Sequence, residues 1–268
     1  MWPRTSIVRP LAAALALAVG TGAALPAAAA PSCDKPVYLT FDTGHMGVAD
    51  LIADVLKRHH VHATFFLANE RTLTDGSSLD DHWAAWWKAR AAEGHAFGSH
   101  TYDHVYWRGD LPDGGFKVRP SAGPQANQGS TMTPAQYCDE IKRSATRFTA
   151  MTGQRMLPIY RAPGGKTSPQ LLAAARQCGY AHVGWADAGF LGDELPSDKY
   201  PNAKLLDQAL RRIQPGDILL AHLGIWSRKD PWAPAVLEPL ITGLQKKGFC
   251  FATLADHPAY ASWLAQHH

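Results

Sequence analysis

The chain has 268 residues, of which 46% are hydrophobic and 18% are charged, which excludes a disordered polypeptide and an exceptionally charged one. Its 26 Lys and Arg residues exceed its 23 Asp and Glu residues, for a formal net charge of +3. Two of the basic residues, Arg4 and Arg9, fall in a segment that we expect to be removed. The charge that remains is close to neutral, so we expect no nucleic acid partner bound through a broad basic surface.

The first 30 residues have the pattern of a cleaved signal peptide. The two arginines are followed by an apolar run over residues 11–25 and by small residues at 27–30 that offer cleavage sites. This run is shorter than the roughly 20 residues that a membrane span requires. We therefore expect residues 1–30 to be removed and residues 31–268 to be periplasmic or secreted, without a transmembrane segment. A retained N-terminal anchor is the alternative.

The rest of the chain alternates between patterns typical of strands and of amphipathic helices. Strands are predicted where β-branched and aromatic residues cluster, and helices where apolar residues recur every three or four positions. The seven predicted strands cover residues 37–41, 63–67, 96–99, 157–160, 180–185, 218–221 and 249–253. The six predicted helices carry their apolar faces over residues 48–56, 83–91, 137–148, 171–175, 205–213 and 236–244.

This alternation predicts a single α/β domain built on a parallel sheet, with its core at about residues 35–253. A closed sheet would make a barrel of seven units, and an open doubly wound sheet is the alternative. Both architectures put functional residues beyond the carboxyl ends of the strands. Residues 109–131, rich in Gly, Pro, Ser and Asn, form an insertion at that end, either an active-site lid or a plain surface loop.

Polar side chains follow five of the predicted strands. These residues are Asp42, His100, His104, Arg161, Asp187 and His222. His100 and His104 are four positions apart, which in a helical turn directs both rings to one side, a spacing typical of metal ligands. Each residue alone is a weak signal, because a single Asp or His at a strand end is usually structural. Their combination predicts one site.

The motifs around these residues carry a family resemblance. They are Thr40-Phe41-Asp42-x-Gly44, Ala63-Thr64-Phe65-Phe66, Gly94-His95 to His100-Thr101-x-x-His104, Arg161-Ala162-Pro163-x-Gly165 and Leu220-Ala221-His222. In this order they resemble the NodB-like polysaccharide deacetylases, carbohydrate esterase family 4. The resemblance implies a distorted (β/α)7 barrel and a metal-dependent hydrolase. Its substrate would be an N-acetylated, or O-acetylated, polysaccharide such as peptidoglycan or a chitin-like glycan.

The resemblance also implies the chemical roles of the main residues. His100 and His104 would hold a divalent metal, for which we choose zinc, through neutral imidazole nitrogens. Asp42 would be the general base that takes a proton from the attacking water. His222 would be the general acid that protonates the leaving amine.

Supporting roles follow for the neighbouring residues. Arg161 would pair with Asp42 and favour its ionised form, and Asp187 would do the same for His222. Leu220 would line the pocket for the acetyl methyl group. Trp107 closely follows His104, and Trp226 closely follows His222. We expect both tryptophans to stack on sugar rings.

Thr43 departs from the family pattern, which has a second Asp there as the third metal ligand. Thr43 itself could be a metal ligand, directly or through water. Asp42 could instead become the ligand, or His45 could turn toward the metal. A fourth possibility is a catalytically impaired protein that only binds glycan. We favour an active enzyme because the other polar residues of the motifs are all present.

The four cysteines are candidates for two disulfides in an exported protein. Cys33 precedes the first predicted strand and Cys250 begins the last, so the two would be neighbours at one end of a closed barrel. Cys138 and Cys178 lie on consecutive outer helices. We therefore predict the pairs Cys33–Cys250 and Cys138–Cys178.

Overall fold

The computed structural model describes Met1 and residues 33–267, and residues 33–267 belong to one domain. The predicted signal peptide lies outside the described residues, apart from Met1. No helix in the described part of the chain is long and apolar enough to cross a membrane.

Strand β1 (Pro36–Asp42) is the centre of a seven-stranded sheet, because three other strands pair with it. All pairings in this sheet are parallel. Beside β1 on one side lie, in order, β2 (Thr64–Leu67), β3 (Ala96–Ser99), β7 (Ile159–Tyr160) and β8 (Ala181–His182). On the other side, β9 (Ile218–His222) pairs with β1. The last strand, β10 (Cys250–Phe251), pairs with the start of β1 at Pro36 and Val37.

The two ends of this sheet approach each other, since a bridge between Phe190 and Leu220 links the segment after β8 to β9. The predicted seven strands and the predicted barrel-type fold are confirmed, although several strands are shorter than predicted. The strand predicted over 180–185, for example, pairs only at Ala181–His182.

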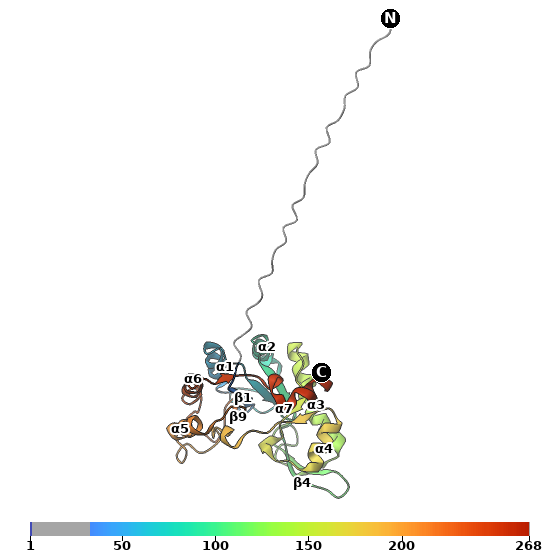
Figure 1. The fold of residues 1–268 in the computed structure, drawn as a ribbon. Coiled ribbons are helices and arrows are strands. Elements are labelled where there is room, and N and C mark those ends of the chain that lie inside the picture. The colour runs from blue at the N-terminus through green and yellow to red at the C-terminus, as the bar shows by residue number, and fades with distance from the viewer. Residues whose placement is uncertain (2–32, 268) are drawn as a thin grey trace. The chain divides into compact units, whose positions relative to one another are not determined.

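Helices lie around the outside of the strands (Figure 1). They are α1 (Ala49–Arg58), α2 (Ala84–Ala92), α3 (Pro134–Thr152), α4 (Pro169–Gln177), α5 (Asn202–Arg212), α6 (Leu237–Lys246) and α7 (Pro258–His267). The first six were predicted, and α7 was not. Their apolar faces bury the sheet: on α2, for instance, Trp87 is fully buried and packs edge-on against Phe65 of β2. Such large buried aromatic contacts hold the helices at fixed positions around the strands.

The insertion predicted as a lid or loop at 109–131 is instead part of a three-stranded antiparallel sheet. Its strands are β4 (Val105–Asp110), β5 (Phe116–Pro120) and β6 (Ser130–Met132). In β5 the buried Phe116 and Val118 alternate with the exposed Lys117 and Arg119. This alternation is typical of a sheet with one buried and one solvent-exposed face. The buried face joins a second hydrophobic cluster with Tyr137 of α3. The insertion is therefore firmly packed on the barrel.

Both predicted disulfides are present. Cys33 pairs with Cys250, which ties the segment before β1 to β10, and Cys138 pairs with Cys178, which ties α3 to the end of α4. In each pair the Cα atoms are 6.1 Å apart. Both bridges join elements that are distant in sequence, so they restrict the unfolded chain.

Candidate active site

The site lies at the carboxyl ends of the central strands. Asp42 is the last residue of β1 and pairs in register with His222, the last residue of β9. His100 directly follows β3, and Arg161 directly follows β7. The sheet thus brings four of the predicted residues to one edge. A cavity of about 330 Å³ opens there, within the size range of small-molecule sites.

The two histidines that we predict as metal ligands meet through a tight turn. Thr101 and His104 both have left-handed backbone angles, with φ of 58° and 49°, so the predicted helical turn is wrong. The hydroxyl of Thr101 accepts a hydrogen bond from the Val105 N–H at 2.7 Å, which closes the turn. As a result the Nε2 atoms of His100 and His104 are 3.2 Å apart. The i, i+4 spacing brings the rings together, but through an unusual backbone shape.

The second ring nitrogen of each histidine is held by another group. His100 Nδ1 lies 2.8 Å from the Arg161 carbonyl oxygen, which can only accept, so Nδ1 carries the proton and Nε2 is left with its lone pair. Burial lowers the pKa of His100 to about 4, so the ring is neutral at neutral pH. His104 Nδ1 is hydrogen bonded to the Ser121 hydroxyl. Metal-binding histidines are typically oriented in this way through their other nitrogen.

These features fit two ligands of a cation, with both Nε2 atoms directed at one point. Within residues 33–267, however, no set of three or more His, Cys, Asp and Glu side chains is arranged as a complete metal site. A third ligand is therefore not supplied in ready geometry by the described side chains.

Asp42 is buried between an arginine and a histidine. Its Oδ1 accepts a hydrogen bond from Arg161 Nη1 at 2.7 Å, and its Oδ2 lies 3.3 Å from His100 Nε2. Burial alone would raise the pKa of Asp42, but the nearby Arg161, His100 and His222 hold it below its usual value. The carboxylate is therefore ionised at neutral pH, with one oxygen facing the cavity.

Arg161 is fully buried and nearly saturated with acceptors. Besides Asp42, its guanidinium donates to the Thr40 hydroxyl at 2.8 Å and to the Val183 and Gly184 carbonyl oxygens at 3.3 and 3.2 Å. A buried charge with this many partners is fixed in position. Arg161 therefore determines where the Asp42 carboxylate lies.

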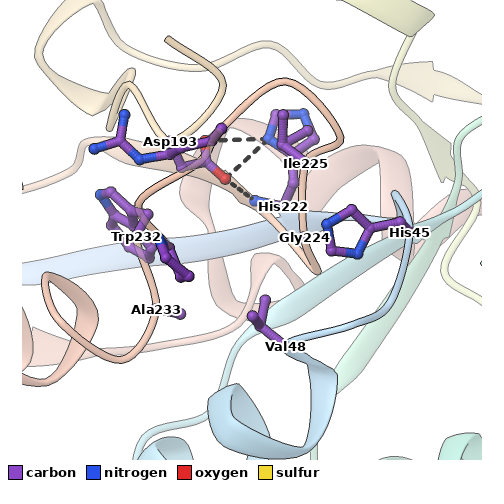
Figure 2. A pocket seen from close by; sticks show the side chains of 10 residues that line it. His45, Val48, Asp193, His222, Gly224, Ile225, Trp232 and Ala233 are labelled. Atoms are coloured by element: carbon purple, nitrogen blue, oxygen red, sulfur yellow. Dashed lines mark hydrogen bonds and ion pairs between the residues drawn. The ribbon is translucent and has the colours of Figure 1, made fainter. Parts of the chain in front are cut away.

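His222 is held by Asp193, as Figure 2 shows. The Asp193 carboxylate oxygens lie 3.1 and 3.2 Å from His222 Nδ1, and Oδ2 also accepts the His222 backbone N–H at 2.7 Å. Burial opposes protonation of the ring, but Asp193, Asp42 and Glu194 together raise the pKa of His222 to about 9. The imidazolium form is therefore the main one at neutral pH.

Asp193, not Asp187, is thus the carboxylate beside His222, which corrects the sequence-based expectation. Asp187 begins the short helix η3 (Asp187–Gly189) and is exposed. The chain runs beside β9 from Phe190 and reaches His222, the last residue of β9, only at Asp193. The loop is fixed by the buried Arg228, whose guanidinium donates to the Leu195 carbonyl. No residue pattern marks this irregular loop, so the sequence offered no signal for Asp193.

Thr43 is buried, and its hydroxyl is already engaged. It donates to Glu70 Oε2 at 2.6 Å and accepts the Ala68 N–H at 3.1 Å. Sequence reasoning missed Glu70, which lies three residues after β2 and lines the same cavity as the two histidines. His45 Nδ1 accepts the Gly47 N–H at 2.9 Å, and it lines a separate, smaller cavity. His45 is therefore not directed at the histidine pair.

The predicted substrate-contacting residues separate into two groups. Leu220 and Trp226 line the cavity, and Trp226 is 59% exposed, with its ring edge-on to His45. Trp107 does not line it: this half-buried residue of β4 donates from its indole N–H to Asp110. Only one of the two tryptophans is thus available at the cavity mouth.

A sequence profile of the polysaccharide deacetylase family matches residues 29–183, more than half of the chain. The chain belongs to the polysaccharide deacetylase family. The peptidoglycan-N-acetylmuramic acid deacetylase PdaA of Bacillus subtilis is 28% identical over 224 residues, 83% of this chain and 71% of the relative. The chitooligosaccharide deacetylase of Azorhizobium caulinodans is 25% identical over 228 residues, 81% of this chain and 92% of the relative.

Solved structures of the deacetylase family share the fold. A family 4 acetyl xylan esterase from Clostridium thermocellum, in complex with a cobalt ion, matches with a TM-score of 0.64 at 22% identity, over 85% of this chain and 92% of that one. The predicted family, fold and hydrolase class are confirmed. A pseudoenzyme of family 4 from Bacillus anthracis also matches, with a TM-score of 0.59 at 18% identity, over 84% of this chain and 66% of that one.

Proposed function

We propose that this protein is a metal-dependent polysaccharide deacetylase that hydrolyses acetyl groups on amino sugars of a glycan. The observation that carries the proposal is the convergence of the His100 and His104 Nε2 atoms beside the ionised Asp42 carboxylate. An ion-pair network without a chemical function would not require two imidazole Nε2 atoms to face the same point in a cavity.

The donor set favours a divalent cation held by His100 and His104, and imidazole ligands make zinc our choice. When bound, such a cation polarises a carbonyl group and increases the acidity of water. The hydrogen bonds at both Nδ1 atoms support this role, because they fix the rings with Nε2 toward the cavity.

Two groups of opposite protonation state would transfer the protons. Asp42, kept ionised by Arg161, would take the proton of the attacking water. His222, kept protonated by Asp193, would give a proton to the leaving nitrogen. Paired groups whose environments drive their pKa values apart are typical of acid and base assignments in enzymes.

The cavity wall supports a sugar substrate with an acetyl group. Leu220 is an apolar side chain suited to the acetyl methyl group, and Trp226 offers an exposed ring for stacking on a pyranose. The relatives named for peptidoglycan and chitooligosaccharides support N-acetylated glycans as the substrate class. The two disulfides support a site of action outside the cytoplasm, in the periplasm or secreted.

The experiment is acetate release from chitooligosaccharides and from peptidoglycan, measured on chelator-treated protein before and after zinc addition. We expect no release from the treated protein and recovery on adding the metal. Glycan binding that is unaffected by chelator, together with no acetate release on either substrate, would instead support a glycan-binding protein without catalysis.

A further inference from the structure

Thr43 and Glu70 form a buried pair next to the proposed metal site. Thr43 follows β1, and Glu70 lies beyond the adjacent strand β2, so neighbouring strand ends bring the two together. The Thr43 hydroxyl donates to Glu70 Oε2 at 2.6 Å while it accepts the Ala68 N–H. Both hydrogen-bonding directions of this hydroxyl are therefore used, and its proton is directed at Glu70 rather than at the cavity.

The other oxygen of Glu70 lies near one of the two histidines. Glu70 Oε1 is 3.8 Å from Nδ1 of His104, and the Glu70 side chain lines the cavity that also contains Asp42 and the two imidazole rings. The Glu70 side chain is only 20% exposed, so its charge is poorly hydrated. No Lys or Arg forms an ion pair with Glu70 among residues 33–267. A half-buried carboxylate in this position is best stabilised by a cation within the cavity.

We infer that Glu70 supplies the carboxylate of the metal site and that Thr43 holds it there. This inference rests on the proposed metal-dependent function. It accounts for the neutral residue at position 43: the negative charge that a carboxylate there would provide comes from the next strand, with Thr43 as its positioning residue. Two imidazoles and one carboxylate give a common ligand set for zinc.

The test is the affinity of the metal-free protein for zinc, measured by isothermal titration calorimetry. Glu70→Gln keeps the size of the side chain and removes its charge, and we expect its Kd for zinc to rise at least tenfold. Glu194→Gln is the matched control, because Glu194 lines the same cavity but makes no ion pair with either histidine. We expect its Kd to stay within about twofold of the original value.

The role of Thr43 is tested by a matched pair of variants. Thr43→Ser keeps the hydroxyl and should keep the affinity, whereas Thr43→Val removes the hydrogen bond to Glu70 and should weaken zinc binding. If Thr43 acts only through Glu70, adding Thr43→Val to Glu70→Gln weakens binding no further. If the losses of zinc affinity in the two single variants add up in the double variant, Thr43 is a ligand in its own right, and its positioning role is overturned.

The outcomes separate this inference from the proposed function. If Glu70→Gln binds zinc as tightly as the original protein while His100→Ala does not bind, the Glu70 inference is wrong and the metal site remains. If the original protein binds no zinc and releases no acetate, the proposed function itself fails. Thermal unfolding of each metal-free variant shows whether the substitution has disturbed the fold.

Discussion

The Nε2 atoms of His100 and His104 face each other across 3.2 Å, at the edge where the central parallel strands end. Each ring is fixed through its Nδ1 atom, one by a backbone carbonyl and the other by a hydroxyl from the β-sheet insertion. Two imidazole lone pairs at this distance repel each other unless a proton or a cation lies between them. The arrangement supports the proposed cation site, and the residues around it determine what chemistry could take place there.

Asp42→Asn tests the general base. The amide keeps the shape of the side chain and still accepts a hydrogen bond from Arg161, but it cannot take a proton from water. We expect kcat to fall by roughly 10²–10⁴-fold. Acetate release under saturating substrate measures the loss, and circular dichroism shows whether the fold is kept. A variant with unchanged kcat would remove Asp42 from the mechanism.

Asp193→Asn tests the source of the His222 charge. In the original protein the pKa of His222 is about 9, so the proton donor persists until the pH approaches that value. Without the Asp193 carboxylate the pKa should fall, and kcat/KM at pH 8 should drop roughly tenfold or more. The alkaline limb of the pH profile should move to lower pH.

Asp187→Asn is the matched control for this experiment. Asp187 is exposed and makes no hydrogen bond or ion pair with His222 in the described structure. Its pH profile should therefore overlay that of the original protein. A shift of the alkaline limb in Asp187→Asn, with none in Asp193→Asn, would reverse the assignment.

The ion pair of His222 and Asp193 also predicts how the stability of the metal-free protein depends on pH. Folding raises the pKa of His222 from about 6.5 to about 9. The contribution of this residue to the free energy of unfolding is therefore fully present below pH 6.5. The contribution is lost as the pH rises through 9, and it is on the order of 3 kcal/mol. Urea unfolding at several pH values measures the free energy of unfolding of the original protein and of Asp193→Asn. The difference between these two free energies should become smaller as the pH rises. A constant difference would count against this linkage.

Trp226→Ala and Trp107→Ala distinguish a tryptophan at the cavity from one beside it. Removing the exposed Trp226 ring should weaken glycan binding and raise KM about tenfold, equivalent to about 1.4 kcal/mol, with little change in kcat. Trp107 does not line the cavity and packs against the second hydrophobic cluster. Its replacement should leave KM unchanged, and equal effects in both variants would contradict the stacking role of Trp226.

Sequence reasoning succeeded where regular periodicity or a local motif carried the information. Alternating strands and helices predicted an α/β domain with a parallel sheet, and the family resemblance indicated the barrel. The residues at the strand ends, such as Asp42 and Arg161, were brought to one edge by the parallel pairing itself. The insertion was misread because its Gly and Pro content concealed the short alternation at Phe116 and Val118.

Two site residues could not be found in this way, because loops position them. Asp193 reaches His222 through an irregular segment anchored by Arg228. Glu70 lies near His104 and is held by a hydrogen bond from Thr43. Neither contact leaves a periodic trace in the sequence, since loop conformation depends on side-chain contacts between distant segments. Both partners are acidic residues among many others on the chain.

The central claim is that His100 and His104 hold a divalent cation, and the most direct measurement is the stoichiometry of metal binding. Chelator-treated protein, titrated with zinc and analysed by elemental mass spectrometry after dialysis, should retain one zinc per chain. His100→Ala and His104→Ala should each retain none, while His45→Ala, outside the pair, should retain one. Retention of a full equivalent of zinc by both alanine variants of the pair would contradict the claim.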